Sequence, residues 1–257
     1  RLVETNPESF LFLGFNNHTK KVLRLLGEYT NKNSSCEVII EANKNDKITK
    51  YHNLKVNYKF VSKIDRNYLN KINFSKYNFV IVQSSYDENI SYDEGSIDNK
   101  SLSIIINLKN IKERNKYNFK IISELFDTNN HDLIQNSQID DFILSEKLIS
   151  SAIAQISENK KLAMVFSELF KTEGSEIYIK PVEEYTYLNK EVNFHEISKS
   201  ALAKKEIAIG YKIQKLNNIP SVIYNNKEMN YGIVINPIKS KNIKFEIGDN
   251  LVVLAVN

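Results

Sequence analysis

The chain has 257 residues, of which 42% are hydrophobic and 26% charged, a balance typical of one large globular domain or two smaller ones. Lys and Arg number 35 against 31 Asp and Glu, and their even mixing argues against nucleic acid as a partner. The single cysteine, Cys36, excludes an internal disulfide and begins an apolar run that predicts a buried side chain. No apolar run approaches the roughly 18 residues of a membrane-spanning helix, and no signal-peptide pattern is present, so we expect this polypeptide to be soluble.

The first 144 residues alternate between apolar runs and amphipathic stretches. The run 10–13 predicts a strand, and Gly14 and a helix over 17–29 follow it. Because the predicted strands are apolar almost throughout, we expect helices on both faces of a Rossmann-like, doubly wound, mainly parallel α/β sheet. Further strands are predicted at 38–40, 56–61, 79–82, 102–106 and 120–125, and further helices at 65–72 and 87–98.

From Ser145 the pattern becomes helical, with two apolar stripes that are wider than a surface helix of one small domain needs. We predict a helical connector over 145–174, which ends at Gly174, and a small α+β lobe over 175–257. The stripes consist of Leu148, Ile149, Ala152, Ile153 and Ile156, and of Leu162, Val165, Phe166, Leu169 and Phe170. In the last lobe the sequence predicts strands at 176–180, 206–213, 231–235 and 251–256, and a helix at 194–204.

The first strand-to-helix turn occupies the place where a Rossmann sheet binds a dinucleotide. Its three glycine positions hold Gly14, Asn16 and Thr19, so a side chain stands where the pyrophosphate would lie. Tight NAD binding is therefore not favoured. Glu41 follows the second strand, where an acid would bind the ribose, and a solvated strand end is the alternative reading.

Acidic residues follow two other predicted strands. Glu124 and Asp127 end the sixth strand, at the carboxyl edge where open α/β sheets bind ligands, or they cap neighbouring amides. A second group of acids follows the fourth predicted strand and could supply oxygen ligands for Ca²⁺. The spacing of these acids does not match an EF-hand loop, and it favours a solvated, acid-rich helix surface. They are Asp87, Glu88, Asp93, Glu94 and Asp98.

Enzyme signatures are missing from the sequence. The four histidines, at 18, 52, 131 and 195, show no metal-ligand spacing. No G-x-S-x-G, Walker-type loop or H-E-x-x-H occurs, so the sequence predicts a protein that is not an enzyme.

Several segments resemble the RCK domains of Castor/Pollux ion channels, in the same order along the chain. They are IISELFDTNNHDLI (121–134), DDFILSEKLISSAIA (140–154) and SELFKTEGSEIYIKP (167–181), followed by FHEI (194–197) and KKEIAIGYKI (204–213). The last stretch, INPIKSKNIKFEIGDNLVVLAV (235–256), is similar to the closing element of RCK C-lobes, with Gly248 and Asp249 in its turn.

The resemblance implies a regulatory, gating-ring domain of a cation channel at the cytoplasmic face of the cell membrane. Such domains pair through crossing helices, matched here by 145–170, and assemble into a ring of eight below a tetrameric pore. The expected partners are therefore a second copy of the chain, the pore and a preceding RCK domain, encoded upstream of Arg1.

Relatives of this kind respond to calcium, sodium or nucleotides. Glu124 matches one calcium-binding position, whereas Gln83 and Phe126 stand where other acids would be expected. The candidate calcium ligands are Glu124, Asp127, Asp87 and Asp93, and the candidate nucleotide contacts are Gly14, Asn16 and Glu41. The alternatives are a TrkA-like nucleotide-sensing subunit of a potassium transporter and an NAD-dependent oxidoreductase, for which no catalytic pair is visible.

Overall fold

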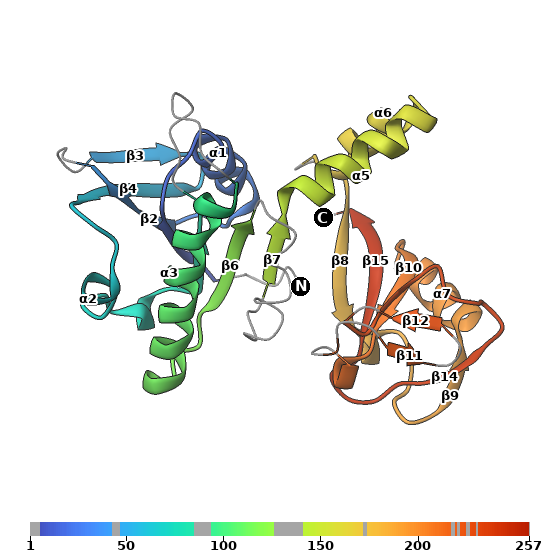
Figure 1. The fold of residues 1–257 in the computed structure, drawn as a ribbon. Helices are drawn as coiled ribbons and strands as arrows, with labels where there is room; N and C mark the ends of the chain where they lie inside the picture. Colours follow the sequence, from blue (N-terminus) through green and yellow to red (C-terminus); the bar gives the residue numbers. More distant parts are fainter. Residues whose placement is uncertain are drawn as a thin grey trace. The chain divides into compact units, whose positions relative to one another are not determined.

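The computed structural model describes residues 6–42, 47–84, 94–125, 141–171, 174–216, 219, 222–224, 227–229 and 231–256. The chain divides into two compact units, the N-terminal unit (Arg1–Glu158) and the C-terminal unit (Asn159–Asn257) (Figure 1). The boundary falls inside the predicted connector, 145–174. None of the described helices is both long and apolar enough to cross a membrane.

The N-terminal unit is built on a seven-stranded sheet in the order β3-β4-β2-β1-β5-β6-β7. All neighbouring pairs are parallel except β3 with β4, which form an antiparallel hairpin at one edge. The mixed α/β class with a mainly parallel sheet is thereby confirmed. The strands are β1 (Ser9–Leu13), β2 (Ser34–Glu41), β3 (Lys47–Tyr51), β4 (Leu54–Val61), β5 (Phe79–Val82), β6 (Lys120–Leu125) and β7 (Asp141–Leu144).

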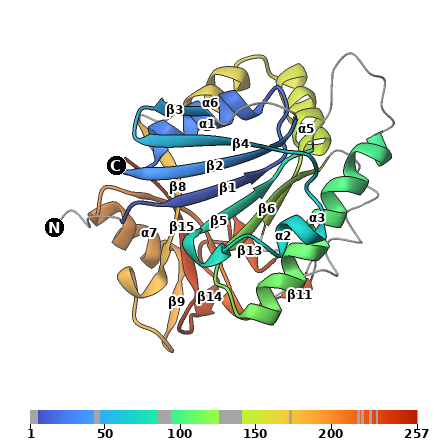
Figure 2. The ribbon, with the colours of Figure 1, turned by 90° about the vertical axis from the view of Figure 1, so that its left-hand side faces the viewer.

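Both faces of this sheet carry apolar side chains, because successive side chains of a strand point to opposite sides, and helices cover both faces. On one face Leu23 of α1 packs with Phe12, Val38 and Val56. On the other face, α2 and α3 pack over a second cluster that includes Leu13 and Val80 (Figure 2). The helices of this unit are α1 (Thr19–Tyr29), α2 (Arg66–Leu69), α3 (Glu94–Asn115), α5 (Ser145–Glu158) and the 3-10 turn η1 (Phe74–Lys76).

The strand predicted at 102–106 is wrong, because these residues belong to α3. The apolar run is part of a longer helical pattern, in which Ile104, Ile105, Leu108 and Ile111 are buried. Their spacing of one, four and seven residues places them on one side of a helix. Ile106, between them, is exposed. The helix predicted at 87–98 begins at Glu94 as α3, and its earlier part lies outside the described residues.

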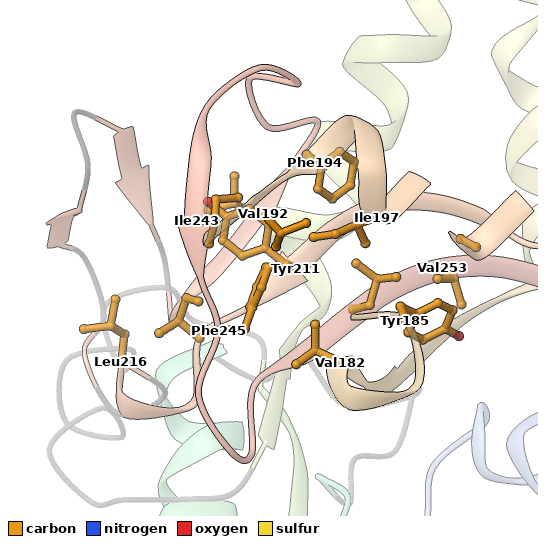
Figure 3. Close-up of a cluster of buried hydrophobic side chains, with 14 of the residues drawn as sticks. Val182, Tyr185, Val192, Phe194, Ile197, Tyr211, Leu216, Ile243, Phe245 and Val253 are labelled. Carbon is orange, nitrogen blue, oxygen red and sulfur yellow. The ribbon is translucent and has the colours of Figure 1, made fainter. Parts of the chain in front are cut away.

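The C-terminal unit contains a four-stranded antiparallel sheet in the order β13-β10-β15-β8 and two small two-stranded sheets. Phe194 and Ile197 of α7 pack against Tyr211 and Val253 of this sheet (Figure 3). The strands are β8 (Ser175–Pro181), β9 (Glu191–Asn193), β10 (Ile207–Lys212), β11 (Val222–Tyr224), β12 (Lys227–Met229), β13 (Ile233–Ile235), β14 (Asn242–Lys244) and β15 (Asn250–Val256). The helices are α6 (Leu162–Leu169) and α7 (Phe194–Ala203), and the 3-10 turns are η3 (Val182–Glu184) and η4 (Gln214–Leu216).

A polar cluster of Glu206, Lys180 and Tyr185 lies beside the hydrophobic core of the C-terminal unit. The Glu206 carboxylate accepts a hydrogen bond from Lys180 Nζ at 2.7 Å and another from the Tyr185 hydroxyl at 2.5 Å. Burial, the largest single influence, raises the pKa of Glu206, but these two hydrogen bonds and the positive charges of Lys180 and Lys204 together outweigh it and lower the pKa below the ordinary value. Burial and the hydrogen bond to Glu206 both raise the pKa of Tyr185.

Candidate ligand crevice at the carboxyl edge of the sheet

The strand order reverses at β1, whose neighbours are β2 on one side and β5 on the other. In open α/β sheets such a reversal leaves a crevice at the carboxyl ends of the strands, where ligands bind. Gly14 begins the turn out of β1 with a φ of 99°, a left-handed conformation that favours glycine. Its amide donates to the Ile39 carbonyl at 3.1 Å and so keeps the turn against β2.

Asn16 stands at the second glycine position and is only 2% exposed. Its side-chain amide donates to the Ser84 carbonyl at 3.1 Å and to Glu124 Oε2 at 3.2 Å. Its side-chain oxygen accepts the His18 amide at 2.9 Å. One side chain thus connects the ends of β1, β5 and β6, in the region where a dinucleotide would place its pyrophosphate.

Thr19, at the third glycine position, is fully buried at the start of α1. Its hydroxyl accepts the Asn16 backbone amide at 2.8 Å and donates to Gln83 Oε1 at 2.7 Å. Donors and acceptors that a dinucleotide site would offer to a ligand are therefore used within the protein. The prediction that tight NAD binding is not favoured stays a prediction.

Glu124 is the charged group of the crevice, with a side chain 16% exposed. Its Oε2 accepts the Asn16 amide, and its Oε1 lies 3.6 Å from Nδ1 of the half-exposed His18. The carboxylate is thus held beside the turn that joins β1 to α1. Within the part of the chain that the structure describes, no three His, Cys, Asp or Glu side chains gather to hold a metal. The other candidate calcium ligands, Asp87, Asp93 and Asp127, lie outside the described residues, as does Glu88.

Glu41, the candidate ribose ligand, ends β2 and is engaged with the protein. Its Oε1 accepts the Ile64 amide at 2.5 Å, and its Oε2 pairs with Lys100 of α3. Glu41 therefore secures the turn after β4 and the position of α3. A ribose contact would have to compete with these two interactions, and the predicted role stays a prediction.

Asp98 does not fit the predicted acid-rich solvated surface, because it is fully buried in the first part of α3. It lies one turn before Ser101, whose hydroxyl is 2.9 Å from the Ser84 hydroxyl and equally buried. Asp98 and Ser101 therefore lie on the buried side of α3, whereas Asn99 and Lys100 between them are exposed. For Glu94 the structure describes the backbone alone, as the first residue of α3.

Sequence reasoning missed three contributors to the crevice, namely His18, Ser84 and Ser101. Ser84 comes two residues after β5, at the edge where polar side chains of parallel strands meet, and this position is a signal that could have been used. Ser101 sits inside an unrecognised helix. Asn16, a candidate nucleotide contact, and Glu124, a candidate calcium ligand, are in direct contact through a hydrogen bond.

The fold is a doubly wound α/β unit followed along the chain by a small α+β unit. Over 136 residues, 52% of its length, the chain is 36% identical to a protein named probable ion channel POLLUX from Arabidopsis thaliana. The chain is 38% identical to the ion channel DMI1 from Medicago truncatula, again over 136 residues and 52% of its own length. It is also 38% identical, over 93 residues or 36% of its length, to the ion channel CASTOR from Lotus japonicus. Over this part the chain is homologous to the CASTOR/POLLUX/DMI1 ion channels, which confirms the predicted resemblance.

The matches take in 15%, 14% and 11% of these three channels, so the chain spans a small part of each. No family model matches the chain. Among solved structures, the crystal structure of the GsuK RCK domain aligns with 99% of this chain and 46% of that one, at 12% identity and a TM-score of 0.41.

Proposed function

We propose that this chain is a regulatory RCK-type domain of a CASTOR/POLLUX-like cation channel, at the cytoplasmic face of the membrane. The observation that carries the proposal is the homology over 136 residues to proteins named as ion channels. The crevice is compatible with it, because it has the Glu124 carboxylate near its edge and offers no nucleophile with an adjacent base among the described residues. On this reading the chain is a binding module and not an enzyme.

The ligand would bind at the carboxyl edge, where Glu124 presents a carboxylate. Because the Asn16 amide fills the pyrophosphate position, a small cation such as Ca²⁺ fits this edge better than a dinucleotide does. A ligand changes gating only if it binds one arrangement of the two units better than another. The proposed divisions are a sensing lobe over 1–144, a connector over 145–174 and a second lobe over 175–257.

The connector helices support pairing between copies. In α5 the large apolar side chains Leu148, Ile149 and Ile153 are each more than half exposed, and α6 has no buried residue. Met164 and Phe170 are exposed by 68% and 71%. Apolar stripes left open on two successive helices are typical of protein–protein contacts. We assign them to a dimer that assembles further into a ring with a preceding RCK domain and the pore.

The ligand is tested by melting the purified chain in Ca²⁺, in a chelator, and in NAD, NADH, ADP and ATP. A ligand at a hundredfold excess over its Kd adds about 2.7 kcal/mol to the stability of the native state. We expect a rise with Ca²⁺ that Glu124→Gln abolishes and that Glu183→Gln, at an exposed site of the C-terminal unit, leaves unchanged. A rise with nucleotides alone would contradict this and favour the TrkA-like sensor.

The dimer is tested by sedimentation of the chain carrying Ile149→Glu with Ile153→Glu. We expect the double substitution to convert dimer to monomer without loss of secondary structure, because two carboxylates cannot be buried unpaired at an apolar contact. Ser151→Glu with Gln155→Glu adds the same charge at exposed positions of the same helix and serves as the control. A monomeric parent chain would refute the pairing.

Channel membership is tested by reading the transcript upstream of the codon for Arg1. We expect it to encode apolar spans of roughly 20 residues. An in-frame stop codon immediately upstream would show that the chain is not a channel tail.

A further inference from the structure

At the edge of the sheet opposite the crevice, the N-terminal unit has a cavity of about 680 Å³. It lies where the β3–β4 hairpin and the loop before β2 meet. Figure 2 shows β3, β4 and β2 side by side. Its volume is within the range of small-molecule sites, roughly 300–1,000 Å³. The residues that line this cavity belong neither to the crevice at the carboxyl edge nor to the helices α5 and α6.

The lining of this cavity is basic. Lys32, Lys50, Lys55 and His52 contribute to it, and no acidic side chain is among the described residues that line it. These three lysines form no ion pair with another described residue. The other polar lining residues are Asn33, Ser34, Ser35, Thr49 and Asn53.

The arrangement of two of these lysines has an electrostatic cost. Lys50 and Lys55 are directly opposite each other in the antiparallel β3–β4 register. Like charges at opposed positions of a β-ladder destabilise it. Lysine on an edge strand also discourages edge-to-edge association, and this would account for Lys50 alone. It does not account for Lys55, which is on the interior strand β4, or for Lys32 on a loop.

The walls of the cavity are held in place by the neighbouring helix. Asn53 donates its side-chain amide to the Thr30 carbonyl at 2.9 Å and its backbone amide to the Gly27 carbonyl at 3.2 Å. The Ser34 hydroxyl accepts the Glu8 amide at 3.1 Å. A ligand would therefore meet a shaped, positively charged surface without first ordering it.

We propose that this cavity binds a small ligand that carries two or more phosphate groups. Lysine ammonium groups bind phosphate as point charges, and hydroxyl and amide groups of Ser35, Thr49 and Asn33 can donate to the remaining oxygens. The volume exceeds what one phosphate fills, and the three lysines favour more than one negative charge. The same chemistry is offered by soluble polyphosphates and by phosphorylated lipid headgroups.

The test is a calorimetric titration of the intact chain with pyrophosphate and with tripolyphosphate. We expect saturable binding at one site, weakened about tenfold or more by Lys50→Gln with Lys55→Gln, because charge-assisted contacts are lost. The control, Lys63→Gln with Lys71→Gln, removes the same charge from exposed positions of the same unit outside the cavity. It should bind as the parent does. Equal weakening in both double variants, or no saturable binding by the parent, would overturn the proposal.

Two further measurements keep the test decisive. If the Lys50 and Lys55 double variant does not fold, Lys32→Gln replaces it, because Lys32 is an exposed loop residue. Flotation with phosphatidylcholine vesicles, with and without a phosphatidylinositol phosphate, separates the sources. If the chain floats with the phosphoinositide vesicles and tripolyphosphate abolishes this, the ligand is a lipid headgroup. If the chain binds tripolyphosphate in the calorimeter but does not float with the vesicles, the ligand is a soluble polyphosphate.

Discussion

At the end of β1, Asn16 makes with one side chain three hydrogen bonds that no glycine could make. The Rossmann turn keeps its first glycine, Gly14, because only there does the backbone need a left-handed φ. At the second glycine position, the Asn16 side chain occupies the space that a glycine would leave open and links the ends of three strands, β1, β5 and β6. Asn16 therefore contributes to the stability of this edge.

We predict that Asn16→Ala lowers the free energy of unfolding of the N-terminal unit by about 1–3 kcal/mol, because buried hydrogen-bond partners lose their donor. Urea unfolding followed by circular dichroism measures it. Asn17→Ala, one residue along and exposed, should change stability by much less. Equal losses from both substitutions would show that the Asn16 network is not stabilising.

In the C-terminal unit, the pairing of the buried Glu206 with the partly exposed Lys180 leads to a pH dependence. The pKa of Glu206 is lower in the folded chain than in the unfolded one, since the hydrogen bonds from Lys180 and Tyr185 and the charges of Lys180 and Lys204 together outweigh burial. The stabilisation is therefore present above the ordinary glutamate pKa and is lost as the pH falls through the folded value.

We predict that Glu206→Gln destabilises this unit at neutral pH and that the difference from the parent shrinks on acidification below the ordinary pKa of 4.5. Thermal melting across a pH series measures it. Glu183→Gln, a carboxylate exposed on η3, should shift the melting temperature little at any pH. A deficit in Glu206→Gln that persists undiminished in acid would refute the assignment.

At the scale of elements, α1 packs closely on the β3–β4 hairpin through Gly27. A Cβ added at Gly27 would lie 2.4 Å from the Tyr51 carbonyl oxygen, a backbone atom. Replacing glycine by alanine inside an isolated helix stabilises it by about 1 kcal/mol. Here the clash opposes that gain, because the helix or the hairpin would have to move.

We predict that Gly27→Ala is destabilising by about 1–3 kcal/mol, as overpacked substitutions are. Lys21→Ala, at an exposed position of the same helix, is the control and should be near neutral. Chemical denaturation measures both. A stabilised Gly27→Ala variant would mean that α1 is free to move away from the hairpin.

Sequence patterns predicted most of the elements, because strands covered on both faces are apolar and continuous, as at β1, β5 and β6. They failed at Ile104–Ile106, where three consecutive β-branched residues hid the longer helical spacing of α3. The crevice was predictable at Gly14, Asn16 and Glu124, since strand ends converge in this fold. The Ser84–Ser101 contact was not, because it depends on tertiary packing across 17 residues.

At the scale of the whole molecule, each unit has its own hydrophobic interior. The cluster around Phe194 and Tyr211 draws only on the C-terminal unit, and those around Phe12 and Phe74 draw only on the N-terminal unit. Separate interiors are the basis of separate cooperative transitions.

We predict two transitions in scanning calorimetry. Asn16→Ala should lower the temperature of one of them and Glu206→Gln that of the other, since each residue belongs to a different unit. The two substitutions together should shift both transitions additively, as independent sites do. A single transition that both substitutions move by the same amount would show that the units unfold as one.

Cys36 is the only cysteine of the chain, and it is 3% exposed beneath α1. Burial, with a smaller effect of the nearby Glu37 carboxylate, raises the pKa of its thiol, so the reactive thiolate is scarce while the fold is intact. A cysteine introduced at an exposed position of α5 or beside the lysine-lined cavity would therefore react with a maleimide dye much faster than Cys36 does. The native chain can carry a single spectroscopic label without removal of its own cysteine, and slow labelling of Cys36 itself would report how often the N-terminal unit opens.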